Sequence, residues 1–352
     1  MATSVSVRVA DLHETLVRYL VGEGLTGPDA GCVADYLVDT ERSGVRTHGI
    51  AHLRSYVRLM RAGTITPRPE LTVLSHTGST LTLHGGNGLG QIVGTWMMRL
   101  AAEQVRQSGA AVVTVRGANH LGALGYYFRL PGLERMGGLL TQVTAPMMLS
   151  PGAVEPRLGN NPFALGLPGS HGRPDLVLDI SSSQTARSRI RQALRRGEDT
   201  PVPPDWALRA DGTPARTAAE AWAGSLLPMA GHKGAGLATV MGALAGVVSG
   251  GAFGGDVTFP DDAVEPRNVG YFLVLFDVSA LMDFDEYADR MDSYLGYLAG
   301  ARTTDGQPVR LPGEHSAANR AATTERVELV PHQWDDLVAQ LEAAGVPVPA
   351  TS

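Results

Sequence analysis

Cysteine is nearly absent from this chain of 352 residues, which contains only Cys32. A single thiol excludes an intrachain disulfide and argues against a metal site built on cysteine. Positive charge is also in deficit, because 35 acidic residues outnumber 29 lysines and arginines and leave a net charge of -6. Such a chain lacks the basic surface that a nucleic-acid partner needs. We therefore expect a cytoplasmic protein with no metal site and no nucleic-acid partner.

Long apolar runs are missing too. The first residues reach charged side chains before any stretch resembles the apolar core of a signal peptide, so none is predicted. Residues 235–255 carry no charge over a length that crosses a bilayer. This stretch is rich in glycine and poor in strongly apolar residues, which favours a small-residue helix buried between neighbours. No membrane partner is expected.

The spacing of apolar residues indicates a mixture of helices and strands. Two helices are predicted between residues 9 and 42, the second starting near Pro28, and others at residues 53–62, 92–108, 285–298 and 331–344. Strands are predicted at residues 71–75, 79–84, 110–116, 137–144, 176–180 and 271–279. Because the two patterns do not alternate in regular βαβ units, a doubly wound sheet is not expected.

A glycine cluster at residues 85–91, GGNGLGQ, lies between a predicted strand and a predicted helix. This position is typical of a dinucleotide-binding fingerprint, but the spacing is GxGxG where the fingerprint needs GxGxxG. The acidic residue that holds a ribose about 20 positions further on is also missing. We interpret the cluster as a tight turn that opens a helix.

Two histidines lie where a proton could be exchanged with a substrate. His48 stands in GVRTHGIAH between two helical segments, and His120 follows a predicted strand in RGANHLG. Imidazole titrates near neutral pH, which suits proton transfer to the oxygen of a carbonyl group under reduction. Taken alone, each ring is more often structural than catalytic.

Two further stretches suit a bound diphosphate. In LDISSSQTARSRIR, Asp179 at a strand end is followed by three serines and by arginines within residues 187–191. Hydroxyls, backbone N–H groups and guanidinium groups bind phosphate, although a capped helix with a solvated basic face fits equally well. His232 and Lys233 precede the small-residue helix, where a cation calls for an anionic partner. The lysine does not follow a GxxxxG turn, which argues against a nucleotide triphosphatase.

Seven segments, taken in order, resemble the malate/L-lactate dehydrogenase family of NAD(P)-dependent oxidoreductases, which lacks a Rossmann fold. They are GVRTHGIAHLRSYVRLMRAGTI, NGLGQ, NHLGALGYY, GNNPFALGLP, LDISSSQTARSRI, LPMAGHKGAGLA and VRLPGEH. The family also contains ureidoglycolate dehydrogenases, sulfolactate dehydrogenases, diketogulonate reductases and Δ1-piperideine-2-carboxylate reductases. The similarity covers residues 39–346 of this chain.

The resemblance implies an α/β fold with its own cofactor-binding sheet domain and a helical domain for the substrate and for dimerisation. We assign residues 1–117 with 298–352 to the helical domain and residues 118–297 to the NAD(P)-binding domain. The resemblance also implies a homodimer with active sites near the subunit contact. A small-molecule substrate and NAD or NADP as cofactor are expected.

The resemblance carries over to individual residues. His48 and His120 match the two family histidines that have been assigned as the catalytic acid or base. Thr47 stands where the family has serine beside the first histidine, and Tyr56 matches a tyrosine of the substrate pocket. The positions that match cofactor contacts are His120, Asp179, Ile180, Ser181, Ser182, Ser183, His232, Lys233, Gly313, Glu314 and His315.

His52 departs from the family pattern, because it replaces an arginine that looks like the clamp for the substrate carboxylate. A histidine lacks the planar fork that binds a carboxylate through two hydrogen bonds. Arg54 could substitute, but two positions further along a helix it points to another side. We therefore predict NAD(P)H-dependent reduction of a C=O or C=N bond in a 2-keto acid-like or cyclic imine substrate. The simple keto acids that correspond to malate and lactate are not the expected substrates.

Two alternatives remain open at this point. The first is an ordinary 2-hydroxy acid dehydrogenase of the malate or lactate type, with Arg54 as the clamp. The second is a degenerate family member that binds a nucleotide without turnover. Retention of both His48 and His120 argues against the second alternative.

Overall fold

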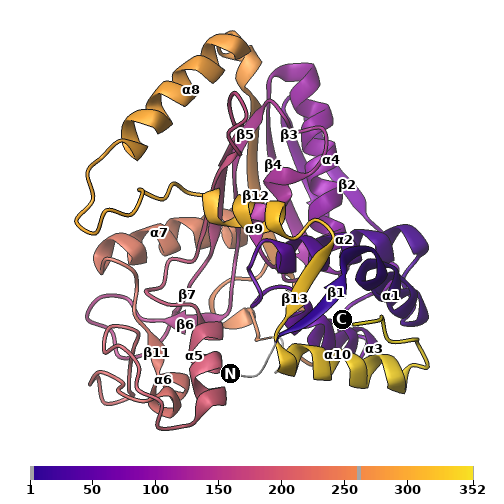
Figure 1. The fold of residues 1–352 in the computed structure, drawn as a ribbon, viewed down its shortest axis with the longest axis vertical. Coiled ribbons are helices and arrows are strands. Elements are labelled where there is room, and N and C mark those ends of the chain that lie inside the picture. Colours follow the sequence, from indigo (N-terminus) through magenta and orange to yellow (C-terminus); the bar gives the residue numbers. More distant parts are fainter. Residues whose placement is uncertain (1–3, 260–262, 352) are drawn as a thin grey trace.

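A computed structural model describes residues 4–259 and 263–351. Its centre is a seven-stranded sheet in the order β2-β3-β4-β12-β5-β8-β9 (Figure 1). The strands are β2 Thr72–Thr77, β3 Thr80–His84, β4 Ala110–Ala118, β5 Met136–Gln142, β8 Phe163–Leu167, β9 Leu176–Ile180 and β12 Val269–Asp277. Neighbouring strands are antiparallel except for the parallel pair β3 and β4. The expectation that the sheet is not doubly wound is confirmed.

The strand register brings several chain segments to one end of this sheet. Val269 at the start of β12 pairs with Ala118 at the end of β4, and Phe163 at the start of β8 pairs with Ile180 at the end of β9. The segments after β3, β4, β5 and β9 therefore meet the segment before β12. We call this the Ala118 end and the opposite one the Met136 end.

Helices from both ends of the chain pack beside the sheet. They are α1 Val9–Gly22, α2 Gly27–Arg42, the 3-10 turn η1 Ile50–His52, α3 Leu53–Arg61, α4 Gly90–Ser108 and α10 Pro331–Ala343. Helix α2 begins as predicted, with Pro28 in its first turn and the Thr26 hydroxyl accepting a hydrogen bond from the Asp29 N–H. The strand pair β1 Val5–Arg8 and β13 Arg326–Leu329 joins the two chain ends.

A second, smaller layer lies next to the main sheet. It holds the strands β6 Pro146–Met148, β7 Leu158–Gly159, β10 Ala207–Leu208 and β11 Ser225–Leu226, with the helices α5 Arg187–Arg196 and α6 Ala218–Ala223. Its own apolar core includes Ile190, Ala207 and Leu226, each fully buried. This core supports the loop that follows β9.

The small-residue helix predicted within residues 235–255 is present as α7 His232–Gly242, continued by the π-helical turn η3 Ala243–Val248. The predicted burial of this helix between neighbours is only partly present in the single chain. Ala235 and Ala238 face the interior, whereas Val240 is 55% and Val247 is 61% exposed. Among the described residues, no helix combines the length and the apolar character needed to cross a membrane.

The remaining elements are η2 Leu124–Arg129, η4 Gly254–Asp256, η6 Val278–Ala280, α8 Phe284–Ala299 and α9 Glu314–Ala322. Helix α8 stands at the upper left of Figure 1, where Met291 and Leu295 pack with Leu167 and Leu176. The predicted helices and strands are present, with ends shifted by a few residues. The division into domains stays a prediction, and the main sheet takes strands from both proposed units.

Candidate active site

Three histidines gather at the Ala118 end of the sheet. His120 follows β4, His48 lies in the turn before η1, and His52 ends η1. The ring centroids are 5.6 Å apart for His48 and His52, 5.9 Å for His48 and His120, and 5.3 Å for His52 and His120. Segments far apart in the sequence thus build one imidazole cluster.

Tyr56 and Gln91 orient the His120 ring. The Tyr56 hydroxyl lies 3.2 Å from Nδ1 of His120, and Nε2 of Gln91 donates to that hydroxyl over 3.0 Å. The same amide faces the carbonyl oxygens of His120 and Leu121, which marks it as the donor. The Tyr56 hydroxyl can donate to Nδ1 of His120 or accept from it, according to the tautomer of the ring. In either case Tyr56 occupies Nδ1, and Nε2 is the ring nitrogen left for a substrate.

Burial keeps all three imidazoles uncharged. It lowers the pKa of His48 to about 4 and the pKa of His52 to about 3, and it places the pKa of His120 well below its ordinary value. The residues retain partial solvent exposure, although protein atoms surround the rings. Nearby imidazoles lower the pKa values of His52 and His120 further, so a proton on one ring disfavours a second proton in the cluster.

The predicted substrate-binding residues separate into two groups. Thr47 joins the cluster through its hydroxyl, 2.9 Å from Nδ1 of His48, and the Tyr56 ring stacks on His52 at 5.7 Å. Arg54 lies outside the histidine cluster. Its side chain is 62% exposed and its Nε lies 2.9 Å from Oδ1 of Asp336 on α10. The structure thus brings Thr47, His52 and Tyr56 together and points Arg54 away.

The glycine cluster packs against the histidine segments. Gly86 has φ 55°, and a Cβ on this residue would overlap the backbone of Glu70. A Cβ on Gly90, the first residue of α4, would overlap the carbonyl of His120. These close approaches confirm the predicted tight turn that opens a helix, and they fix the backbone at His120.

A buried carboxyl group supports the His48 turn. Oε1 of Glu41 on α2 accepts a hydrogen bond from the Ile50 N–H over 2.8 Å, while Oε2 is buried without a partner among the described residues. A Cβ on Gly49 would overlap the same carboxyl group. Burial raises the pKa of Glu41 to about 7. The turn that carries His48 therefore rests on a group that titrates near neutral pH.

The predicted cofactor residues form a second group beside the start of α7. The Ser182 carbonyl accepts from the Met229 N–H over 2.9 Å, and Ser183 forms an isolated bridge with Pro228. Residues 181–183 therefore lie next to the turn that leads into His232 and Lys233, both exposed.

The start of α7 leaves room for a dinucleotide diphosphate. A Cβ on Gly231 would meet no atom within 4 Å, so the backbone before α7 is open to a ligand. The exposed Lys233 ammonium group is a donor that binds phosphate oxygens, whereas the Ser182 and Ser183 hydroxyls are buried and donate to backbone carbonyls. With the cofactor bound, Lys233 would contact its diphosphate.

Asp179 links the two groups. Its Oδ2 accepts a hydrogen bond from the Gly125 N–H over 2.8 Å, in the segment that also carries His120. Parts of the residue are exposed, yet protein atoms crowd the carboxyl group and raise its pKa to about 6. Its neighbour Ile180 ends β9 and pairs with Phe163.

The predicted residues Gly313, Glu314 and His315 lie apart from residues 181–183. A Cβ on Gly313 would lie 2.9 Å from the Asp175 carbonyl, so the start of α9 packs against the beginning of β9. The five residues of β9 span about 17 Å between the two places. The predicted cofactor contacts thus line both ends of one strand.

Residues 7–338 match the malate/L-lactate dehydrogenase family. The chain belongs to this family. L-Sulfolactate dehydrogenase from Methanothermobacter thermautotrophicus is 33% identical over 298 residues, which cover 84% of this chain and 85% of the relative. The NADP(+)-dependent (2R)-3-sulfolactate dehydrogenase from Chromohalobacter salexigens is 30% identical over 346 residues, 96% and 98% of the two chains. The solved sulfolactate dehydrogenase from Methanocaldococcus jannaschii gives a TM-score of 0.88 at 28% identity, covering 97% and 98%.

Membership of the malate/L-lactate dehydrogenase family makes the chain an NAD(P)-dependent oxidoreductase. The predicted α/β fold of this family is confirmed by the structural match over nearly the whole chain. NAD or NADP is confirmed as the cofactor class. The roles of individual site residues stay predictions.

Sequence analysis missed three residues at the histidine cluster. Gln91 ends a glycine-rich motif, Tyr36 lies within a helix of apolar periodicity, and no motif surrounds Arg267. Arg267 is 6% exposed, and its charge contributes to the lowered pKa of His120. Only hydrogen bonds and charges across distant segments reveal these residues.

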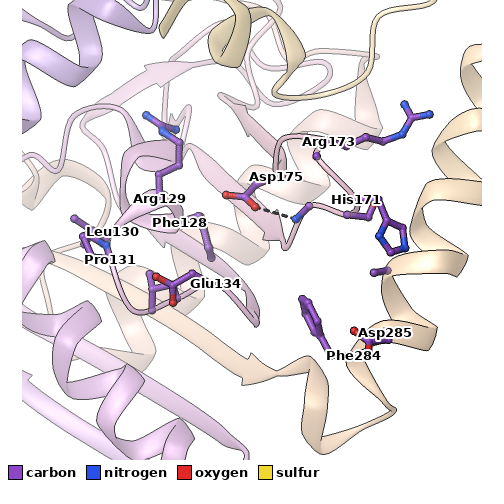
Figure 2. Close-up of a pocket in the computed structure, with 15 residues that line it drawn as sticks. Phe128, Arg129, Leu130, Pro131, Glu134, His171, Arg173, Asp175, Phe284 and Asp285 are labelled. Carbon is purple, nitrogen blue, oxygen red and sulfur yellow. Dashed lines mark hydrogen bonds between the residues drawn. The ribbon is translucent and has the colours of Figure 1, made fainter. Parts of the chain in front are cut away.

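A cavity of about 420 Å³ lies at the Met136 end, away from the histidine cluster (Figure 2). It is lined by the segments before β5 and β9 and by the start of α8. Most of its charged side chains already have partners: Nε of Arg173 contacts Asp292, and Nε2 of His171 lies 2.7 Å from Asp289. Figure 2 shows the side chains of Arg129 and Arg173 turned away from the middle of the cavity. This cavity therefore offers a poorer setting for proton transfer than the histidine cluster.

Proposed function

We propose that this cytoplasmic enzyme uses NAD(P)H to reduce a C=O or C=N bond in a substrate other than the simple keto acids of malate and lactate. The observation that carries the proposal is the position of His52 between His48, Tyr56 and His120. With a pKa of about 3, His52 is uncharged at neutral pH. It provides neither the fixed charge nor the two-pronged geometry of the arginine that it replaces.

In this proposal His120 transfers the proton. The cofactor supplies the hydride, and the chain must protonate the oxygen or nitrogen that gains negative charge. Tyr56 and Gln91 hold the His120 ring through Nδ1, which leaves Nε2 to exchange a proton with that atom. In the oxidative direction, a neutral His120 ring with its proton on Nδ1 accepts the substrate proton at Nε2. For reduction, an anionic group of the bound substrate raises the pKa of the nearby imidazole and prepares it as an acid.

The test is a comparison of catalytic efficiencies. Pyruvate, oxaloacetate, larger 2-keto acids and cyclic imine carboxylates are offered with NADH and with NADPH, and malate, lactate and sulfolactate with the oxidised cofactors. We expect the highest kcat/KM on a substrate other than pyruvate and oxaloacetate. Efficient reduction of either of these two acids, equal to the best substrate, would contradict the proposal.

An ordinary 2-hydroxy acid dehydrogenase is the second candidate, and Arg267 favours it. Its Nε and Nη2 donate to the Thr258 carbonyl over 3.0 and 2.7 Å, just before β12 at the Ala118 end. Burial lowers the pKa of Arg267 to about 10, and the nearby Tyr271 and Tyr56 raise it. A guanidinium charge near the histidine cluster can attract a carboxylate. In this second case Arg267→Lys raises KM for small 2-keto acids and leaves NAD(P)H affinity unchanged.

We also propose that the enzyme is a homodimer and that the exposed apolar face of α7 and η3 forms part of the contact. Leu237, Val240, Val247 and Val248 expose between 38% and 61% of their surface on consecutive turns. Exposed apolar patches of this kind mark protein contacts. Val240→Asp combined with Val247→Asp should yield monomers in sedimentation velocity, whereas Leu281→Asp, at an exposed site elsewhere, should not. A double variant that stays dimeric would place the contact on another surface.

A further inference from the structure

Tyr36 connects the two segments that carry the catalytic candidates. It lies on α2, and its hydroxyl donates a hydrogen bond to the His48 carbonyl over 3.1 Å. The same oxygen accepts a hydrogen bond from the Ala123 N–H over 2.6 Å. Ala123 lies three positions after His120. One hydroxyl therefore ties the His48 turn to the His120 loop by using both its donor and its acceptor capacity.

The surroundings leave Tyr36 little freedom. The residue is fully buried, and its ring packs edge-to-face on Tyr126 at 5.1 Å and stacks with Tyr127 at 6.5 Å. Gly122 has φ 82°, and a Cβ there would overlap the Tyr36 hydroxyl. The backbone after His120 thus packs directly against the Tyr36 hydroxyl oxygen. A side chain at residue 122 would prevent this contact.

Burial also keeps the hydroxyl in one protonation state. It raises the pKa of Tyr36 well above the ordinary value of 10, with the neighbouring Tyr56 adding to the shift. The hydroxyl therefore remains a donor to the His48 carbonyl over the whole range in which an enzyme of this type works. The connection does not switch with pH.

We propose that Tyr36 is a positioning residue that sets the spacing between the His48 and His120 rings. This inference rests on the proposed function, because it assumes that a substrate meets both rings. Tyr36 is fully buried and does not touch the substrate itself. It acts by fixing two backbone segments, and a displacement of either ring lowers turnover when geometry decides proton transfer.

The test is Tyr36→Phe, with Tyr126→Phe as the matched control. Both changes remove one oxygen from the same aromatic cluster, but within the described part of the chain the Tyr126 hydroxyl forms no hydrogen bond. We expect Tyr36→Phe to lower kcat by about 10- to 100-fold and to shift the pH profile of kcat, with little change in the dissociation constant for NAD(P)H. Tyr126→Phe should retain wild-type values.

A second measurement does not depend on turnover. In protein labelled with ¹⁵N-histidine, the ring resonances of His48 and His120 should move in Tyr36→Phe and stay in place in Tyr126→Phe. The inference is overturned if both variants give the same kcat, pH profile and ring resonances. It is also overturned if the two variants lose stability and kcat in equal proportion, since the hydroxyl then adds only packing.

The inference and the proposed function fail separately. If His48→Ala and His120→Ala both keep wild-type turnover, the proposed catalytic roles are wrong, and the ring resonances alone decide whether Tyr36 sets the spacing. If those variants lose turnover while Tyr36→Phe matches its control, the proposed function stands and the inference about Tyr36 fails.

Discussion

The two ends of the main sheet differ in the burial of their titratable side chains. At the Ala118 end, burial lowers the pKa values of His48, His52 and His120 and keeps the rings uncharged even at mildly acidic pH, where imidazole in water is protonated. At the Met136 end, around the cavity of about 420 Å³, His171 pairs with Asp289, and both side chains are more than half exposed. Exposed pairs of that kind contribute about 0–1 kcal/mol, whereas desolvated titratable groups cluster at functional sites. The state of the titratable groups thus indicates the site better than the volume of a cavity does.

The largest expected difference between the two ends is in turnover. His120→Ala should lower kcat by roughly 10²–10⁴-fold with cofactor affinity nearly intact, because it removes the proposed acid or base. His48→Ala should also lower kcat, but less. The control His171→Ala, at the Met136 end, should leave steady-state kinetics unchanged. Wild-type turnover in both the His48 and the His120 variant would show that the catalytic residues lie elsewhere.

Cofactor affinity offers the next contrast. Lys233→Ala removes a charge-assisted contact worth roughly 1.5–3 kcal/mol, so NADH and NADPH should bind about 10- to 100-fold more weakly in a fluorescence titration. Arg173→Ala removes a positive charge at the Met136 end and should change nothing in the same assay. Unchanged affinity together with unchanged turnover in Lys233→Ala would exclude this lysine from the cofactor site.

The KM values for small keto acids test whether the uncharged His52 limits the binding of their carboxylate. His52→Arg restores a guanidinium group and should lower KM for pyruvate and oxaloacetate by up to about 10- to 100-fold while slowing the native substrate. The control Arg54→Ala should leave these KM values unaltered, because Arg54 pairs with Asp336. A large rise in KM for the control would instead identify Arg54 as the clamp.

The smallest effect concerns the pH dependence of stability through Glu41. Its pKa is raised from 4.5 to about 7, so the unfolded chain loses this proton at lower pH than the folded chain does. The contribution of Glu41 to the free energy of unfolding therefore falls between pH about 4.5 and about 7, by something on the order of 1–3 kcal/mol. Glu41→Gln should remove this slope in urea unfolding at several pH values. An identical slope in variant and wild type would contradict the assignment.

Sequence analysis predicted the elements and the candidate residues, because apolar periodicity and family motifs are local features of the chain. It could not predict how hydrogen bonds join distant segments. Tyr36 follows an apolar helical pattern, and nothing local shows that its hydroxyl meets Ala123, 87 positions away. Arg54 was expected to point elsewhere from helix geometry, but its partner Asp336 comes from the other end of the chain. The exposed face of α7 was missed because small apolar residues do not reveal how many sides are covered.

The central place of β12 also determines when the site can form during synthesis. This strand lies between β4 and β5 in the sheet but follows both of them late in the sequence. During synthesis on the ribosome, the edges of β4 and β5 that face each other therefore stay unpaired until residue 277 has emerged. Unpaired strand edges promote aggregation. His120 follows β4, which is made early, whereas Arg267 directly precedes β12. A nascent chain that stops before β12 can hold all three histidines and still have no assembled site.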